Sequence, residues 1–483
     1  MPDKKSDKKF VVIGAGPAGL AATYTLSKQS IPAVCLEADT QVGGLSRTVE
    51  YKGFRFDIGG HRFFTKIREV DALWREVLDA DYLRRPRLSR IYYRNKFFNY
   101  PLKPVQALFG LGLLESVRIL GSYAAAKIHP SVPEVNLEQW VSNRFGKRLF
   151  TIFFKTYTEK VWGLPCTELS AEWAAQRIKS LSLVSALMNA LFKRGGKGQI
   201  TTLIEEFDYP RLGPGQMYEA MAAKVEKMGN QVAMGRKVIK LCREGERILE
   251  AIAQTDGMRT ESFSGTDFVS TMPLSELVLA MDPPAPQEVR TVAENLSYRS
   301  IITVNLLIDR EKLFPDTWIY VHSPEVRIGR IQCYKNWSPY MVPDPSKSSL
   351  GLEYFATEGD DLWNAPDEEL IQMGEEEISR LGLCPRESIV DGFVVRMAKA
   401  YPVYDSAYVK SFKCIPEWVK TLRNLQPCGR YGLFRYNNAD HSILSAMYAV
   451  RTLLGEPGCD VWSVNTEEEY HEEDRGGDAG GRV

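Results

Sequence analysis

Three glycines near the N-terminus have the spacing of a turn that binds the phosphates of a dinucleotide. Gly14, Gly16 and Gly19 follow the apolar run Phe10–Ile13 and precede a stretch with helical periodicity. In such a turn the first glycine permits a tight bend, the second lets the backbone approach a pyrophosphate, and the third lets the helix pack closely on its strand. The N–H groups at the start of the helix would then face that pyrophosphate.

The elements around this turn have the order of a βαβ unit. A second apolar run, Ala33–Leu36, ends at Glu37, about twenty residues after the turn, where an acid accepts hydrogen bonds from the adenosine ribose. A lone GxGxxG motif often occurs in chance loops. Because strand, turn, helix, strand and acid all occur in order, the sequence favours a dinucleotide site over such a loop.

A second glycine turn, Gln41–Thr48, follows Glu37 closely. It resembles the loop that runs along the FAD pyrophosphate in a large flavoenzyme superfamily, which includes amine oxidases, protoporphyrinogen oxidases and UDP-galactopyranose mutases. The resemblance implies FAD as the cofactor. The contacts that it implies in this loop are Gly44, Leu45, Ser46 and Arg47.

Three later segments are similar to superfamily segments that touch the cofactor. Phe56–His61 matches the segment that passes the isoalloxazine ring, which implies that Gly59 and Gly60 lie beside the flavin. The resemblance gives His61 a role in tuning flavin hydrogen bonding, with a purely structural histidine as the alternative. Ser270–Pro273 and Val238 sit where the family brings backbone to the cofactor, although each segment alone reads equally as an ordinary sheet turn.

A more discriminating pattern occurs in the helical region, at Phe153–Gly163. It resembles the segment of UDP-galactopyranose mutases that holds the uridine and leads to the flavin. Aromatic faces bury a base at modest entropic cost. The alternative is that these side chains form the core of an apolar helix. The substrate-binding residues implied by this resemblance are Phe153, Phe154, Tyr157 and Trp162.

Two arginines resemble those with which the mutases hold the substrate diphosphate. Arg177 lies in the segment Leu169–Arg177, and Arg330 lies in the segment Gly329–Tyr340. The resemblance also implies that Trp337, in the second segment, contacts the substrate. A guanidinium group can fork onto two phosphate oxygens, so a pair of them suits a diphosphate. The alternative for each is a surface arginine in an ion pair of little energetic value.

The C-terminal part is similar to the closing FAD segment of the mutases. Within Gly429–Asp440 the resemblance places Arg430 near the flavin and gives Tyr436 a hydrogen bond to the diphosphate. Tyr401, in a Tyr-Pro motif, is implied to face the same diphosphate. We expect a strand, a turn and a helix over Gly432–Leu454. The remaining implied cofactor contacts are Asn438, Asp440 and Ser442.

The resemblance implies an unusual use of flavin. In the mutases, N5 of reduced FAD attacks the anomeric carbon of a nucleotide-sugar, and the pyranose and furanose rings interconvert without net redox. This isomerase activity would imply a place in cell-wall polysaccharide biosynthesis. An FAD-dependent oxidase or desaturase of the amine oxidase and protoporphyrinogen oxidase type is the alternative, and a flavin scaffold without chemistry is a third. NAD(P)H is a possible external reductant, although no separate fingerprint for it is present.

Three departures from the mutase pattern leave the sugar and the base open. Trp337 stands where eukaryotic mutases carry a tyrosine, and the residues after Arg177 lack the second arginine of the bacterial form. Phe207–Gly215 is an arginine-bearing version of the usual glycine-rich approach to the flavin.

Composition excludes several other classes of protein. Lysine plus arginine (61) equals aspartate plus glutamate (61), so nothing suggests a nucleic-acid partner. The eight cysteines are scattered without metal-ligand spacing, which predicts no metal site and fits a cytoplasmic chain. Glu115 and Arg118 interrupt the apolar stretch Ala107–Ala126, so we expect a core or interface helix and no membrane insertion. A homo-oligomer is possible.

The fold class expected is α/β, with a Rossmann-like FAD domain, an inserted helical domain and an antiparallel-sheet substrate domain. The FAD domain would comprise residues 1–95, 201–285 and 396–465. The helical substrate-binding insertion would occupy 96–200 and the sheet-rich substrate domain 286–395. The acidic, glycine-rich end, 466–483, is expected to be a disordered tail.

Overall fold

The computed structural model describes residues 7–465, apart from 101, 103, 172–205, 256, 405–407, 409 and 410. The expectations for Arg177 and for the tail 466–483 therefore lie outside the described residues.

The predicted βαβ unit forms the centre of a five-stranded parallel sheet. Strands β1 (Phe10–Ile13) and β2 (Ala33–Leu36) have the predicted boundaries, and they pair in parallel. The predicted helix between them is α1 (Pro17–Lys28). The sheet order is β20 (Leu425–Pro427), β13 (Asp267–Ser270), β1, β2 and β9 (Gln231–Ala233).

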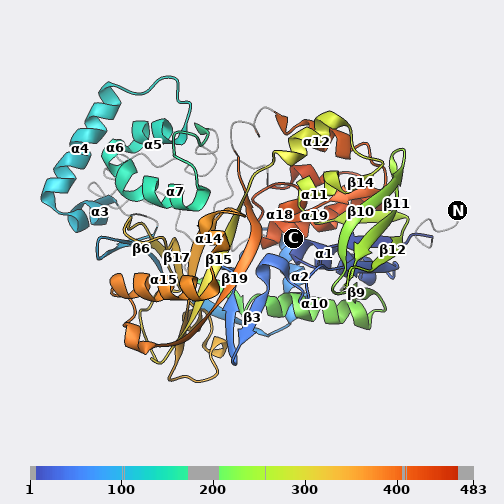
Figure 1. Cartoon of the computed structure of the whole chain (residues 1–483), viewed down its shortest axis with the longest axis horizontal. Coiled ribbons are helices and arrows are strands. Elements are labelled where there is room, and N and C mark those ends of the chain that lie inside the picture. The colour runs from blue at the N-terminus through green and yellow to red at the C-terminus, as the bar shows by residue number, and fades with distance from the viewer. Residues whose placement is uncertain are drawn as a thin grey trace, which may run out of the picture.

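Alternate residues of β1 enter two different cores, as expected for a strand that is buried on both faces. Phe10 and Val12 pack against the helical layer, which includes α10 (Gly215–Lys227) and α19 (Ala439–Leu453). Val11 and Ile13 pack against a small second sheet on the opposite face. Figure 1 shows this three-layer body on the right. The second sheet has the order β12 (Thr260–Ser264), β11 (Arg247–Gln254), β10 (Lys237–Glu244) and β14 (Met281–Asp282).

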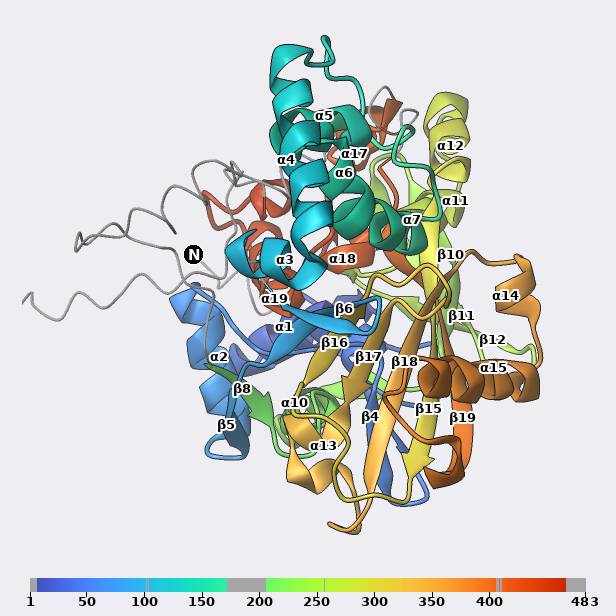
Figure 2. The ribbon, with the colours of Figure 1, turned by 90° about the vertical axis from the view of Figure 1, so that its left-hand side faces the viewer.

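A seven-stranded sheet stands beside this body, and Figure 2 shows its strands as a fan. Its neighbours are antiparallel except for the parallel pair β16–β6, so the predicted antiparallel sheet is in fact mixed. Helix α15 (Asp367–Arg380) packs on one face. The strand order is β19 (Ile389–Pro402), β15 (Tyr298–Ile308), β18 (Ser348–Ala356), β17 (Arg330–Cys333), β16 (Trp318–Val321), β6 (Ser89–Tyr93) and β7 (Lys96–Asn99).

The predicted helical region stands at the end of this sheet (Figure 2). Its helices are α3 (Pro104–Leu111), α4 (Leu113–Ile128), α5 (Leu137–Phe145), α6 (Lys147–Phe150), a π-helical turn (Thr151–Lys155) and α7 (Thr156–Trp162). In α4, Ile119 is buried but Leu113 and Leu114 are exposed, so the expectation of a core helix is wrong and that of an interface helix stays a prediction. No helix in the described part of the chain is long and apolar enough to cross a membrane.

The C-terminal strand lies earlier than the sequence pattern predicted. Strand β20 precedes Gly429, whereas the residues between α18 (Gly429–Gly432) and α19 form no strand. The expected strand-turn-helix over Gly432–Leu454 is therefore wrong in its strand and correct in its helix. The three residues of β20 are too few to show a period from sequence alone.

Shorter elements complete the described chain. They are β3 (Thr48–Tyr51), β4 (Phe54–Asp57), α2 (Arg68–Leu78), β5 (Tyr82–Pro86), β8 (Glu206–Pro210), α11 (Leu274–Leu279), α12 (Gln287–Glu294), α13 (Tyr334–Trp337), α14 (Asp361–Asn364) and α17 (Cys414–Val419).

Candidate active site

A cavity of about 720 Å³ runs from the glycine turn after β1 to the inner face of the seven-stranded sheet. Its volume lies within the range of ligand pockets in proteins. One wall comes from the parallel sheet and its turns, and the other comes from β16, β17 and β19. The two walls are far apart in sequence, so the cavity exists only because the two sheets pack together.

The glycines of the first turn are required by their surroundings. Gly14 has a φ of +92°, and a Cβ there would lie 2.1 Å from Oγ1 of Thr271. A Cβ at Gly19 would lie 1.7 Å from the carbonyl oxygen of Gly14. At Gly16, in contrast, the nearest atom to an added Cβ is Cα of Gly44 at 3.8 Å, which leaves this backbone open to the cavity. The turn therefore has the close approach that a pyrophosphate needs.

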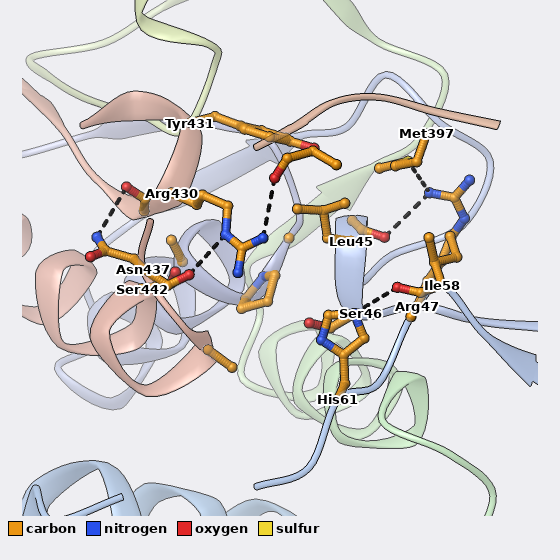
Figure 3. Close-up of a pocket in the computed structure, with 18 of the residues that line it drawn as sticks. Leu45, Ser46, Arg47, Ile58, His61, Met397, Arg430, Tyr431, Asn437 and Ser442 are labelled. Atoms are coloured by element: carbon orange, nitrogen blue, oxygen red, sulfur yellow. Dashed lines mark hydrogen bonds between the residues drawn. The ribbon is translucent and has the colours of Figure 1, made fainter. Parts of the chain in front are cut away.

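The second glycine turn packs against the first. Gly43 and Gly44 have φ values of +103° and +52°, and a Cβ at Gly44 would lie 3.2 Å from Cα of Gly16. Arg47 donates from Nη1 to the carbonyl oxygen of Gly44 at 3.2 Å and contacts Sδ of Met397 at 3.5 Å (Figure 3). Gly44, Leu45, Ser46 and Arg47 all line the cavity.

Glu37 lies at the carboxyl end of β2, where it lines the cavity. Its Oε2 accepts a hydrogen bond from the amide of Ala15, and its Oε1 accepts one from the amide of Asp39 at 2.9 Å. Burial raises the pKa of Glu37, and these two hydrogen bonds oppose that effect. The carboxylate thus connects the first turn to the end of β2, beside Val238, which also lines the cavity.

The segment after β4 brings His61 to the cavity with its ring nitrogen Nε2 2.8 Å from the carbonyl oxygen of Ile58 (Figure 3). Burial, together with the positive charges of Arg430 and Arg330, lowers the pKa of His61 to about 4. The imidazole is therefore neutral at pH 7. A Cβ at Gly60 would lie 3.0 Å from Nε2 of Gln332, so this segment approaches the seven-stranded sheet closely.

Arg430 connects the closing segment to the sheet. Its Nε donates to the carbonyl oxygen of Asn437 at 2.8 Å, and its Nη1 donates to that of Ala400 at 3.2 Å (Figure 3). Its guanidinium lies 4.7 Å from the ring centroid of Tyr436 and 5.7 Å from that of Tyr401. Asn438, Asp440 and Ser442 line the cavity at the start of α19.

Arg330 forms a buried ion pair in the sheet wall of the cavity. Its Nη2 lies 2.5 Å from Oε2 of Glu353 and 2.8 Å from the hydroxyl of Tyr401. Burial acts to lower the pKa of Arg330, but the Glu353 carboxylate and the hydroxyls of Tyr401, Tyr157 and Tyr436 together outweigh burial and raise that pKa well above its usual range. Burial raises the pKa of Tyr401 to about 12. Because the Tyr401 hydroxyl accepts from Arg330, its own proton is available to another acceptor.

Two polar atoms beside this ion pair are buried without a hydrogen bond to any described residue, namely Nε of Arg330 and Oε1 of Gln332. Leaving buried polar atoms unsatisfied costs about 1–3 kcal/mol each. Both residues line the cavity, so a polar ligand is the natural partner for these atoms.

The aromatic residues singled out in the helical region lie outside the cavity lining. Phe153 and Trp162 are buried in the core cluster between these helices and the sheet, and Phe154 stacks on Phe145 at 5.4 Å. The ring of Tyr157 stacks on that of His322 at 4.9 Å. None of these four side chains lines the cavity, although Tyr157 contacts the ring of Tyr320, which does.

Trp337 does line the cavity, but its indole N–H is already used. Its Nε1 donates to the carbonyl oxygen of Thr317 at 2.8 Å, and its ring stacks on that of Trp318 at 5.3 Å. It therefore offers an apolar face to a ligand and no hydrogen.

Sequence reasoning missed several residues of the sheet wall. Glu353 gives one usable signal, because it is a lone acid within the apolar strand Ser348–Ala356. Gln332, Met397 and Asn437 give none, since each lies in a segment of ordinary composition. Three further residues of the cavity, which the sequence analysis did not select, are Arg62, Trp318 and Tyr320.

The fold and the cavity define a flavoprotein. Residues 17–431 match the family of flavin containing amine oxidoreductases, and the chain belongs to this family. The glycine turns, Glu37 and the open backbone at Gly16 fit a flavin dinucleotide, and FAD is the cofactor, as predicted.

Individual curated relatives include several oxidases. Protoporphyrinogen oxidase 2 of Arabidopsis thaliana is 21% identical over 451 residues, covering 83% of this chain and 85% of that protein. L-amino-acid oxidase of Bungarus fasciatus is 23% identical over 322 residues, which are 63% of this chain and only 58% of that protein.

Among solved structures, reduced UDP-galactopyranose mutase is similar with a TM-score of 0.80, at 22% identity over 95% of this chain and 98% of that one. Putrescine oxidase bound to putrescine has a TM-score of 0.60, at 15% identity over 93% of this chain and 99% of that one. The resemblance to this superfamily is confirmed, and at these identities the structural likeness shows the fold.

Proposed function

We propose that the protein is an FAD-dependent nucleotide-sugar mutase that resembles UDP-galactopyranose mutase. The observation that carries this proposal is a cluster at the cavity, formed by Arg330 and Tyr401 of the sheet wall with Arg430 and Tyr436 of the closing segment. Two guanidinium groups and two phenol rings, with the hydroxyl of Tyr401 available as a donor, suit the oxygens of a diphosphate.

The residues of the chain would hold the leaving diphosphate in one position. Arg330 would donate from its unsatisfied Nε, and Tyr401 would donate its hydroxyl proton. Glu353 would act as a positioning residue, because its carboxylate fixes the guanidinium of Arg330. Preorganised donors of this kind stabilise developing charge without reorganising during the reaction.

The FAD would lie along the two glycine turns, with Glu37 at its adenosine end and His61 at its ring end. Reduced FAD, when bound, would supply the nucleophile for the anomeric carbon, so that the sugar ring changes size without net redox. Neutral His61, whose Nε2 donates to the carbonyl oxygen of Ile58, would accept one hydrogen bond at Nδ1 without adding charge. The proposal also includes Arg177 as a second arginine that holds the diphosphate, a cytoplasmic location and a homo-oligomeric state.

An oxidase of the amine oxidase type is the second candidate, and the oxidases among the sequence relatives favour it. The rings of Tyr401 and Tyr436 stack at 5.6 Å, an arrangement that could hold a substrate between aromatic faces. Arg430, however, already lies over Tyr436 at 4.7 Å. A cationic amine at the same rings would meet this charge, which argues against an amine substrate.

The proposal is tested by mixing the purified holoenzyme, reduced with dithionite, with UDP-galactopyranose and UDP-galactofuranose and separating the products by chromatography. Interconversion is expected. If the reduced enzyme interconverts neither compound and binds no nucleoside diphosphate, the proposal is wrong. Rapid reduction of the oxidised flavin by an amine would instead support the oxidase.

A further inference from the structure

A second group of cationic and aromatic side chains lies at the same cavity. Four of them line it, namely Arg62, Tyr100, Trp318 and Tyr320, and Arg87 packs against two of their rings. The guanidinium carbons of Arg62 and Arg87 lie 5.2 and 5.5 Å from the ring centroid of Trp318. Arg87 is also 5.6 Å from the ring of Tyr100, which lies 4.6 Å from the ring of Tyr320. We refer to these five residues as the Trp318 cluster.

The cluster concentrates positive charge where water is partly excluded. Burial lowers the pKa of Arg62 to about 10, and the charge of Arg87 contributes to this effect. Burial also lowers the pKa of Arg87. Within the described residues, Arg87 makes no ion pair with a carboxylate, and its buried Nε has no hydrogen-bond partner. One guanidinium on an indole is a common structural contact, but a second one on the same ring adds repulsion that an anion would relieve.

The cluster is close enough to Arg330 for one ligand to reach both. On the neighbouring strands β16 and β17, Trp318 pairs with Gln332 and Tyr320 pairs with Arg330. Arg330 and Trp318 are therefore one strand and two residues apart, or about 8 Å between Cα atoms for ordinary strand spacing. Both side chains line the cavity.

We propose that the Trp318 cluster binds a second oxyanion group, a carboxylate or a phosphate, of a ligand whose diphosphate lies at Arg330. This inference rests on the proposed function, which supplies the diphosphate. Arg62 lines the cavity and can fork onto an oxyanion, and Arg87 supplies a second guanidinium group at the same ring of Trp318. The aromatic rings help to exclude water from the anion. The substrate would then be an acidic nucleotide-sugar, such as one that carries a uronic acid.

Whether the cluster binds a carboxylate is tested with a matched pair of ligands, UDP-galactose and UDP-galacturonate. Their dissociation constants are measured on the FAD-bound enzyme by calorimetry. In the unmodified protein, UDP-galacturonate is expected to bind about ten-fold more tightly or better. In R87A this preference should disappear, and in R87K, which keeps the charge but not the fork, it should shrink. UDP itself should bind R87A as it binds the unmodified protein.

Arg84→Ala is the matched control. Arg84 lies on β5 and forms an exposed ion pair with Glu206, so its removal should leave the preference unchanged. Flavin absorbance and the thermal midpoint, measured for every variant, identify any that fails to fold. If R87A does not fold, R87K carries the test.

Whether the cluster binds a phosphate is tested by titrating inorganic phosphate into the holoenzyme, once with excess UDP present and once without UDP. Binding that R87A abolishes and R84A retains would assign the cluster to phosphate. The inference is overturned if neither arm shows a dependence on Arg87. If UDP and UDP-galactose fail to bind while phosphate binding still depends on Arg87, the proposed function falls and the anion site stands.

Discussion

Arg330 and Glu353 face one another across the paired strands β17 and β18, with Nη2 and Oε2 2.5 Å apart in the wall of the cavity. The carboxylate is fully buried, and the guanidinium has one side to the cavity. The ion pair therefore holds a cation at the cavity surface while it leaves Nε of Arg330 for a ligand.

Replacing Arg330 should separate ligand binding from folding. Arg330→Lys keeps the charge beside Glu353 but loses the fork, so we expect the holoenzyme to fold and to bind UDP about ten-fold more weakly. Arg330→Ala leaves a buried carboxylate unpaired and should lower the free energy of unfolding by about 3–5 kcal/mol. Calorimetry with UDP and urea unfolding measure the two effects. Arg327→Ala, an exposed position three residues earlier, is the control. UDP affinity unchanged in R330K would remove Arg330 from the ligand site.

The two glycines of the first turn should respond differently to alanine. A Cβ at Gly14 meets Thr271 and the backbone has a positive φ, so G14A is expected to lower the thermal midpoint of the apoprotein as well as its FAD content. A Cβ at Gly16 would meet no protein atom closer than 3.8 Å, so G16A should leave the thermal midpoint of the apoprotein unchanged. Its FAD affinity should fall, because the methyl group occupies the path of the pyrophosphate. The flavin-to-protein ratio and thermal unfolding distinguish the two. Retained FAD in G16A would contradict the placement of the cofactor.

The βαβ unit could be predicted from sequence because each of its parts is local. Its three elements follow one another in the chain, at Phe10–Ile13, Pro17–Lys28 and Ala33–Leu36, and the glycines of the turn can be read directly from the sequence. The sheet wall of the cavity could not be predicted from sequence, because its contacts join strands that are distant in the chain. Arg330 meets Glu353 through such a pairing, and β6 pairs with β16 from more than two hundred residues away. The aromatic residues from Phe153 onward pose a different difficulty, because the same sequence pattern is equally compatible with the core of a helical region.

Asp57 should make stability depend on pH. Burial raises its pKa to about 7, although hydrogen bonds from Tyr209 and Thr48 oppose this. The ordinary value is near 3.8, so the stabilisation from neutral Asp57 is fully present below about pH 4 and is lost as pH rises to about 7. Asp57→Asn mimics the neutral acid. Between pH 5 and pH 8 the free energy of unfolding should fall in the unmodified protein by on the order of 2 kcal/mol more than in D57N.

Urea unfolding of the two proteins at both pH values measures this difference. Asp81→Asn serves as a control, because Asp81 is only partly buried and pairs with Arg211 near the surface. Parallel pH profiles for D57N and the unmodified protein would show that Asp57 is charged in the folded state.

We propose above all that reduced FAD acts on a nucleotide-sugar without being consumed. The most direct test counts the turnovers of each enzyme molecule while the redox state of its flavin is followed. The reduced holoenzyme is incubated anaerobically with the nucleotide-sugar that it binds most tightly, while flavin absorbance and sugar ring form are followed together. The account predicts many turnovers of ring interconversion per flavin with the flavin still reduced at the end, and none from the oxidised enzyme. Product formed in proportion to the flavin oxidised or reduced, or equal activity in both redox states, would contradict it.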